Sequence, residues 1–361
     1  MQKGIVIRLY PNNEQKELLN KMFGCVRKVY NYFLDYATEN KVYNYNIWSK
    51  LLTELKNSND YSYLKECDKF GLQNSLKNLK STFNNFFNKR SKYPSFKSRR
   101  NQCDSYRTNY TNNNIDLLDK YIKLPKLGLV KCKYNKELDN VKIINVTIKK
   151  NGSIYEASII YEEEIVQYDK TNNVVGIDLG VRKLVTTSDN EKYISSLDLL
   201  KIENKIRKAQ KKLSKKKKDS KNYIKQKNKL NKIYRYKKNY TKDIIHKVTT
   251  KLVKEYDIIF MEDINIKDLL DKQDLKNKRK KMLSSCLGKI REYLEYKVVM
   301  HDKKLVKIDK YYASSKICSR CSSMYEVKDN EIYCCPECGN IIDRDYNAAI
   351  NILNRGLTLI S

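Results

Sequence analysis

Residues 174–184 read VVGIDLGVRKL, an apolar run that ends at the acidic side chain of Asp178. The run predicts a buried strand, and KLVTTS (183–188) predicts its hairpin partner. A single acid at a strand end is most often a turn or cap residue. Here the small residues Gly176 and Gly180 would also let a phosphate backbone approach closely. Asp178 is therefore a candidate metal ligand.

Two further stretches place acids at the ends of apolar elements. In YDIIFMEDIN (256–265) a buried strand ends at Glu262 and Asp263, and in DRDYNAAINIL (343–353) Asp345 precedes a helix. Because side chains alternate along a strand, Glu262 shares a face with Phe260, and Asp263 could instead cap the following turn. Asp343 or Asp345 could equally be the helix N-cap.

Asp178, Glu262 and Asp345 together predict a cation site for phosphodiester cleavage. Magnesium prefers oxygen ligands, and two such ions can clamp the attacking and leaving oxygens of an in-line displacement. The elements around the acids add a strand at 192–194, a Lys-rich helical hairpin at 200–255, a helix at 281–300 and a strand at 305–309. This order predicts an α/β fold of the RNase H-like type.

Four cysteines shortly before Asp345 have the spacing of a metal site. Cys318 and Cys321 form one Cys-x-x-Cys pair, and Cys335 and Cys338 form another after thirteen residues. Four thiolates suit tetrahedral Zn²⁺, and a site without an open position would be structural. A [4Fe–4S] cluster is the alternative. Cys334 is a spare neighbour, but the Pro and Gly of CPECG (335–339) favour Cys335.

The first 170 residues show two kinds of periodicity. A strand is expected at 4–10, and FGLQNSLKNLKSTFNNFFNKR (70–90) carries an apolar stripe typical of a helix core. From about residue 119 apolar and polar residues alternate, with a hairpin signal at Asn151-Gly152. We therefore predict a helical domain at 11–118 and a small β-domain at 119–170, which the strand within residues 1–10 joins.

The charge of the chain predicts a polyanionic partner. There are 74 basic and 42 acidic residues, a formal net charge of +32, and residues 201–250 alone contribute +17. Such a charge favours nucleic-acid binding. Mutational bias of an AT-rich genome, which inflates Lys, and a solvated hairpin without a partner are the alternatives. No run of 18 apolar residues occurs, so we expect a cytoplasmic protein without a membrane span.

These motifs together resemble the TnpB family, the OrfB-type proteins of bacterial insertion sequences. The resemblance covers nearly the whole chain. Besides the stretches quoted above, its segments are IRLYPNNEQ (7–15), FGCVRKVYNYFL (23–34), YPSFKS (93–98), IKLPKLGLVK (122–131) and SSKICSRC (314–321).

The resemblance implies an RNA-guided DNA endonuclease that cuts beside a short adjacent motif. It implies a helical recognition domain (11–118), a β-barrel-like wedge domain (1–10 and 119–170) and a RuvC-like nuclease domain (171–361) with a zinc ribbon inserted at about 314–342. The expected partners are a guide RNA from the transposon end and double-stranded DNA, in a monomeric ribonucleoprotein.

The resemblance also assigns residues. Asp178, Glu262 and Asp345 fall on the catalytic triad, which holds two Mg²⁺ ions. One structural Zn²⁺ is held by four residues, Cys318, Cys321, Cys335 and Cys338. Gln73 and Lys77 lie in the helix that approaches the target-adjacent DNA.

Two departures from the family pattern are visible. Cys321 is followed by Ser322 where the family usually has Gly, which costs a flexible turn position, and the helix at 281–297 lacks a frequent Trp. Members that have lost acids act as guided DNA-binding repressors, so a nuclease-silent regulator is one alternative. A strand-transfer transposase is another, although its third acid is usually Glu and no zinc ribbon directly precedes it.

Overall fold

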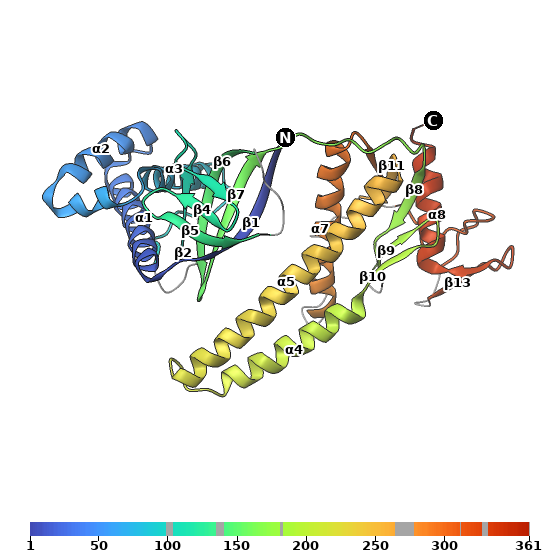
Figure 1. Cartoon of the computed structure of the whole chain (residues 1–361). Helices are drawn as coiled ribbons and strands as arrows, with labels where there is room; N and C mark the ends of the chain where they lie inside the picture. The colour runs from blue at the N-terminus through green and yellow to red at the C-terminus, as the bar shows by residue number, and fades with distance from the viewer. Residues whose placement is uncertain are drawn as a thin grey trace. The chain divides into compact units, whose positions relative to one another are not determined.

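The chain forms two compact units, Met1–Glu164 and Ile165–Ser361, each with its own hydrophobic cores. The computed structural model describes residues 1–98, 104–134, 141–180, 183–263, 278–310, 312–326 and 331–360 (Figure 1). Within these ranges no helix is long and apolar enough to cross a membrane.

Helices build one part of the first unit. They are α1 (Asn13–Asn40), α2 (Tyr45–Asn57), the 3-10 helix η1 (Asn59–Glu66) and α3 (Lys69–Phe87). A capping box starts α1, because the Asn12 side chain accepts from the Gln15 backbone N–H at 2.8 Å and the Gln15 side chain accepts from the Asn12 N–H. On α3 the residues Leu72, Leu76, Leu79 and Phe83 are buried, which confirms the predicted core stripe up to Phe83. The predicted stripe also includes Phe86 and Phe87, but Phe87 is 53% exposed.

A seven-stranded antiparallel sheet completes the first unit, in the order β2-β6-β7-β1-β5-β4-β3. Its strands are β1 (Gln2–Tyr10), β2 (Asp104–Asn109), β3 (Asp116–Leu118), β4 (Tyr121–Leu124), β5 (Gly128–Lys133), β6 (Lys142–Asn151) and β7 (Ile154–Glu162). The N-terminal strand β1 pairs with both β5 and β7. The hairpin predicted between β6 and β7 is confirmed, with Gly152 at φ +61°.

The sheet begins before the predicted boundary at residue 119, because β2 and β3 already belong to it. In β2 only Tyr106 and Thr108 are buried, and the other residues are polar. A strand with two core residues and a polar remainder resembles a loop in sequence, which explains the difference.

The second unit is built on a five-stranded sheet in the order β10-β9-β8-β11-β12. Its strands are β8 (Val174–Asp178), β9 (Lys183–Thr187), β10 (Lys192–Ser195), β11 (Ile258–Glu262) and β12 (Lys304–Ile308). Three neighbouring strands, β8, β11 and β12, run parallel, and β9 is antiparallel to β8. Ile177 pairs with Met261, so Asp178 and Glu262 follow side by side at the carboxyl edge of the sheet.

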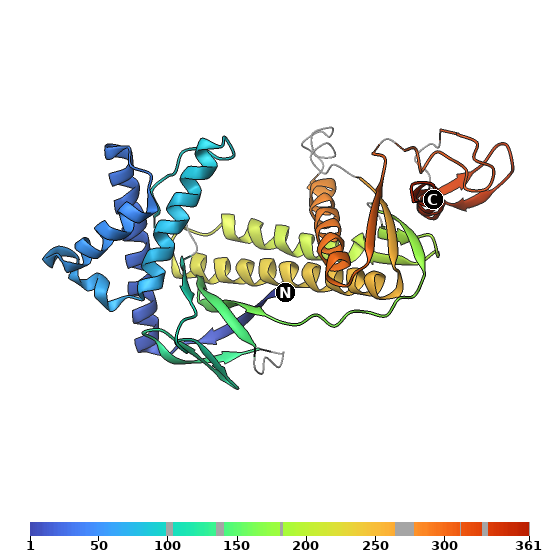
Figure 2. The ribbon, with the colours of Figure 1, turned by 90° about the horizontal axis from the view of Figure 1, so that it is seen from above.

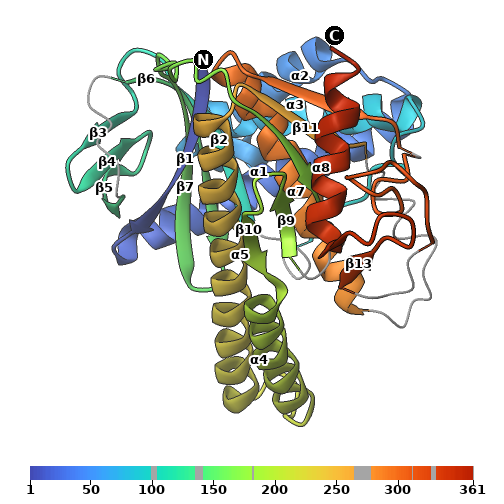
Figure 3. The same cartoon turned by 90° about the vertical axis from the view of Figure 1, so that its right-hand side faces the viewer.

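Helices cover both faces of this sheet. On one face α5 (Lys221–Glu255) and α7 (Lys278–Met300) pack against residues such as Ile177 and Met261. On the other face lies α8 (Arg344–Leu357) (Figure 3). It packs through Ile352 against Phe260. Because side chains alternate, Val174, Gly176, Ile258 and Phe260 share this second face, which we call the α8 face.

Two glycines let α8 lie directly on the strands. A Cβ atom at Gly176 of β8 would lie 2.3 Å from the Ala349 carbonyl oxygen and 2.6 Å from the Leu353 nitrogen. A Cβ atom at Gly356 of α8 would lie 2.0 Å from the Phe260 ring. Gly176 therefore serves helix packing, and the expectation that it admits a phosphate backbone is wrong.

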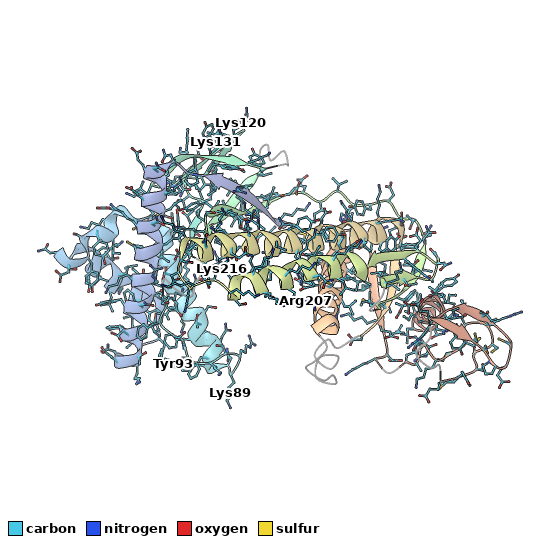
Figure 4. The ribbon with its side chains drawn as sticks, turned by 90° about the horizontal axis from the view of Figure 1, so that it is seen from below. Lys89, Tyr93, Lys120, Lys131, Arg207 and Lys216 are labelled. Carbon is cyan, nitrogen blue, oxygen red and sulfur yellow. The ribbon has the colours of Figure 1, made fainter. Side chains whose placement is uncertain are left out.

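A basic helical hairpin extends from the sheet of this unit (Figure 2). It consists of α4 (Ser196–Ser214) and the longer α5, and it confirms the hairpin predicted over residues 200–255. A narrow apolar seam joins Ile202, Ile206 and Ala209 to Leu230. Away from this seam the hairpin presents charged side chains, including Arg207 and Lys216 (Figure 4).

The substitution Gly176→Ala tests the seating of α8. Because the added methyl group meets backbone rather than a flexible side chain, the free energy of unfolding of the second unit should fall by about 3 kcal/mol or more. Urea unfolding measures this. The control is Gly24→Ala in α1, where nothing lies within 4 Å and the helix should gain about 1 kcal/mol. A Gly176→Ala variant as stable as the parent would contradict the packing described.

Candidate active site and metal centre

The three predicted acids come from three elements that meet at the α8 face. Asp178 follows Gly176 by two residues and Glu262 follows Phe260 by two, so both side chains point to the face that α8 covers. Asp345 lies in the first turn of α8. In open α/β sheets the carboxyl ends of parallel strands are the usual place for a ligand.

Asp178 and Asp345 converge beside Gly180. A Cβ atom at Gly180 would lie 3.6 Å from Asp345 Oδ2 and 3.8 Å from Asp178 Oδ2, and only 2.8 Å from the Lys183 carbonyl oxygen, so the two acids approach a position where a side chain would not fit. Burial, together with the negative charges of Asp345 and Glu262, raises the pKa of Asp178 to about 8. These acids therefore repel one another, and a bound cation would relieve that repulsion.

Glu262 is held separately from the other two acids. The Ser314 hydroxyl donates a hydrogen bond to Glu262 Oε1, and burial raises the pKa of Glu262 while this hydrogen bond lowers it. Among the residues that the structure describes, the oxygens of the three acids do not all lie within 4.8 Å of one another. The structure thus brings the acids to one face without gathering them into a closed ligand set.

The acids adjacent in sequence have other partners. Asp263 points to the opposite face and pairs with Arg291 of α7 at 2.9 Å. Asp343 is the N-cap of α8, where its side chain accepts from the Tyr346 N–H at 3.0 Å, and it also pairs with Lys192. Of the two acids that could cap this helix, Asp343 does so.

The four cysteines form a compact cluster. The ligand atoms of Cys318, Cys321, Cys335 and Cys338 all lie within 4.8 Å of one another. The Sγ atoms of Cys318 and Cys338 are 3.6 Å apart, as are those of Cys321 and Cys335. Zinc–sulfur bonds of about 2.3 Å require sulfur–sulfur separations of about 3.8 Å, so the cluster could hold one Zn²⁺.

Backbone amides support both cysteine pairs in the same way. The N–H groups of Arg320 and Cys321 donate to the Cys318 sulfur, and those of Glu337 and Cys338 donate to the Cys335 sulfur. The Ser323 hydroxyl and these amides lower the pKa of Cys335 to about 6, which favours the thiolate that a metal requires. Cys334 is exposed in the short strand β13 (Ile332–Cys334), which pairs with β14 (Ile341–Asp343), and it lies outside the cluster.

Each cysteine pair is followed by a residue in the left-handed region. Gly339 has φ +67°, and Ser322, at the equivalent place after the first pair, has φ +62°. Ser322 stands where the family usually has glycine. It therefore adopts a conformation that costs about 1 kcal/mol for any residue other than glycine.

Gln73 and Lys77 lie on α3 of the first unit, away from its core face. Gln73 is half-buried and Lys77 is exposed, with its Nζ 5.7 Å from the centre of the Tyr45 ring. Lys80, on the same flank, instead donates to the Tyr43 carbonyl at 2.6 Å. A role of Gln73 and Lys77 in binding DNA stays a prediction.

Two residues with a structural part in the site were not identified from the sequence. Asn347 and Asn351 of α8 are buried and donate side-chain hydrogen bonds to the Ile317 carbonyl, at 2.7 Å and 2.6 Å. They attach the first cysteine pair to the helix that carries Asp345. Asparagine is a poor helix former, so two of them in the apolar stretch NAAINIL are a signal of buried hydrogen-bond partners.

Comparison with known proteins identifies the family. Residues 158–273 match OrfB_IS605, described as "Probable transposase", residues 288–352 match the Cas12f1-like TNB domain, and residues 1–45 match a helix-turn-helix domain of OrfB_IS605 proteins. In residues 1–45 the structure has β1 and one long helix, α1, before α2 begins at Tyr45.

Curated relatives match along nearly the whole chain. A "Putative RNA-guided DNA endonuclease" of Streptomyces pristinaespiralis is 32% identical over 99% of this chain and 90% of its own length. A protein of Escherichia coli K12 with the same description, InsQ, is 29% identical over 98% of this chain and 92% of its own length. The TnpB-like protein L770 of Acanthamoeba polyphaga mimivirus is 26% identical over 97% of this chain and 72% of its own length.

Among solved structures, the Cas12f1 chain of a Cas12f1–sgRNA–target DNA complex has a similar fold. The TM-score is 0.57 at 12% identity, with 98% of this chain and 99% of that chain covered. The chain thus has a multidomain α/β fold similar to that of this Cas12f1 chain. The chain belongs to the TnpB family, which confirms the resemblance found in its motifs.

The substitution Ser322→Gly tests the strain beside the cysteine cluster. It should stabilise the first cysteine pair by about 1 kcal/mol, because glycine adopts a positive φ without a steric cost. We expect slower zinc release to a chelator and a melting temperature about 2–4 °C higher. Ser315→Gly, at a residue outside the left-handed region, is the control and should be neutral or destabilising. Equal effects of the two substitutions would argue against strain at Ser322.

Proposed function

We propose that this protein is an RNA-guided DNA endonuclease of an insertion sequence, which cuts target DNA beside a short adjacent motif. The observation that carries the proposal is the convergence of Asp178, Glu262 and Asp345 on the α8 face of a chain that belongs to the TnpB family. A guided regulator with a silent site and a strand-transfer transposase are the alternatives.

The proposed nuclease domain is an RNase H-like, RuvC-type domain over residues 171–361. Its support is the sheet order β10-β9-β8-β11-β12, in which a hairpin precedes parallel strands with helices on both faces. The proposed zinc ribbon, at about 314–342, contains the four cysteines and the β13–β14 pair. Four cysteines leave no open coordination position, so zinc there would be structural and would stabilise the folded ribbon.

The acids fit divalent magnesium by their chemistry. All three offer carboxylate oxygens, which Mg²⁺ prefers, and the raised pKa of Asp178 indicates negative charge that lacks compensation. When bound, Mg²⁺ would supply an activated water and charge neutralisation at the scissile phosphate. The chain itself would fix Asp178 and Glu262 on rigid strand ends and keep Asp345 opposite them.

Guide RNA and target DNA would be held by charge and shape rather than by base sequence. The hairpin of α4 and α5 carries most of the +17 charge between residues 201 and 250, which suits a phosphate backbone. Sequence would be read by pairing between guide and target. Gln73 and Lys77 are proposed contacts to the target-adjacent duplex. The working form is proposed to be a cytoplasmic complex of one protein chain with its RNA.

The decisive experiment is guided cleavage. The protein, co-expressed with its flanking locus, should purify with an RNA and should cut matched plasmids beside one short motif when Mg²⁺ is added. Asp178→Ala should reduce cleavage at least about 10³-fold with RNA binding unchanged, because it removes a metal ligand and no RNA contact. Bound RNA without cleavage would favour the silent regulator, and joined donor–target products would favour the transposase.

Neighbouring acids provide matched controls for the site. Asp345→Ala should abolish cleavage, whereas Asp343→Ala should cost about 1 kcal/mol as a lost N-cap and retain cleavage. Glu262→Ala should likewise abolish cleavage, whereas Asp263→Ala should retain it, because Asp263 pairs with Arg291 on the other face of the sheet. Melting curves and cleavage rates measure both effects, and loss of cleavage in the Asp343 or Asp263 variant would refute this assignment.

Magnesium binding should depend on pH. With a pKa of about 8, Asp178 holds its proton at pH 7, and a cation must displace that proton. Affinity for Mg²⁺ should therefore fall roughly tenfold per unit as pH decreases below 8, and should level off above it. Calorimetry in two buffers of different ionisation enthalpy would show proton release at pH 7. A Mg²⁺ affinity that does not change between pH 6 and pH 8 would contradict the raised pKa of Asp178.

A further inference from the structure

Glu262 is anchored by a residue outside the sheet. Ser314 precedes Cys318 by four residues and donates its hydroxyl proton to Glu262 Oε1. Ser314 is buried and Glu262 is half-buried, so this hydrogen bond lies partly out of contact with water. The bond fixes the orientation of the Glu262 carboxylate, whose oxygens keep further lone pairs that could bind a cation.

Ser314 is itself held by α8. Asn351 donates from its Nδ2 atom to the Ser314 carbonyl at 2.8 Å and to the Ile317 carbonyl at 2.6 Å. Asn347, one turn earlier, donates to the same Ile317 carbonyl at 2.7 Å and accepts from the Ser319 N–H at 2.9 Å. Four hydrogen bonds thus attach the segment 314–319 to one side of the helix.

These contacts link parts of the site that are distant in sequence. Asp345, Asn347 and Asn351 lie on the same helix, and Asn347 and Asn351 hold the segment that carries both Ser314 and Cys318. Asn347 is fully buried and Asn351 is 3% exposed, and both side chains donate hydrogen bonds to this segment. The arrangement is therefore built into the core and is not a chance surface contact.

We propose that Ser314 is a positioning residue for Glu262, kept in register by Asn347 and Asn351. The proposal rests on the proposed function for the role of Glu262 as a metal ligand. Partners in the outer shell of a metal site fix the orientation of the ligand, and their loss typically lowers metal affinity about 10- to 100-fold. Ser314 and Cys318 are separated by three residues, so a short backbone segment connects the first cysteine pair to the proposed cation site.

The test measures Mn²⁺, as a spectroscopic substitute for Mg²⁺, by electron paramagnetic resonance on the full-length chain loaded with zinc. The parent should show a site that Glu262→Ala removes. Ser314→Ala should bind Mn²⁺ about tenfold more weakly, and Ser314→Thr, which keeps the hydroxyl, should restore binding to within about threefold. Ser315→Ala is the matched control, because the structure assigns its side chain no hydrogen bond among the described residues.

A second pair of variants tests the hydrogen bonds that α8 donates to the segment 314–319. Asn351→Ala removes two hydrogen bonds to the segment and should also weaken Mn²⁺ binding, whereas Asn354→Ala, at an exposed position of α8, should not. In guided cleavage, Ser314→Ala should raise the half-saturating Mg²⁺ concentration about tenfold and leave the rate at saturating Mg²⁺ nearly unchanged. A structural defect would instead lower the saturated rate.

The outcomes separate this inference from the proposed function. Parent-like Mn²⁺ binding by Ser314→Ala, or equal loss in the Ala and Thr variants, would overturn the role of Ser314 even if guided cleavage is found. A Glu262-dependent Mn²⁺ site that Ser314→Ala weakens, in a protein that does not cleave, would support the role of Ser314 and refute the nuclease. If Glu262→Ala leaves Mn²⁺ binding intact, the metal role of Glu262 fails, and this inference fails with it.

Discussion

The direct contact between the backbones of α8 and β8 is the constraint on which the second unit depends. Gly176 permits it on the strand, and Gly356 permits the matching approach of the helix to Phe260. Two residues beyond Gly176 and Phe260, the strands present Asp178 and Glu262 to the face that the helix covers, and the helix begins with Asp345. One packing contact therefore determines where three acids from separate parts of the chain come together.

Charges of opposite sign are left uncompensated in two places of the second unit. Around Asp178, burial and neighbouring acids raise its pKa, so negative charge there is unfavourable unless a cation is bound. Along the hairpin of α4 and α5 there are 20 basic and 3 acidic residues between positions 201 and 250. A divalent cation suits the first place and a polyanion suits the second. The proposed ligands thus complete the electrostatics of the fold as well as its activity.

The sequence predicts the elements of the second unit well, because their signals are local. These signals are the apolar runs that end in an acidic residue and the spacing of the cysteines. Asp178, Glu262 and Asp345 do reach one face, and Cys335 rather than Cys334 joins the cysteine cluster. The sequence does not reveal what Gly176 contacts, because a close approach to α8 depends on tertiary packing. The buried hydrogen bonds of Asn347 and Asn351, and the strand β2 with only two core residues, were missed for the same reason.

The position of Asp345 in chain order has a consequence for biosynthesis. A ribosome makes β8 and β11 first, and the helix that carries the last acid and covers their shared face follows the cysteine segment. Until α8 has left the exit tunnel, the emerging chain has an uncovered sheet and an incomplete set of acids. The three acids can therefore come together only after the cysteine segment and α8 have both been made and have folded onto the strands.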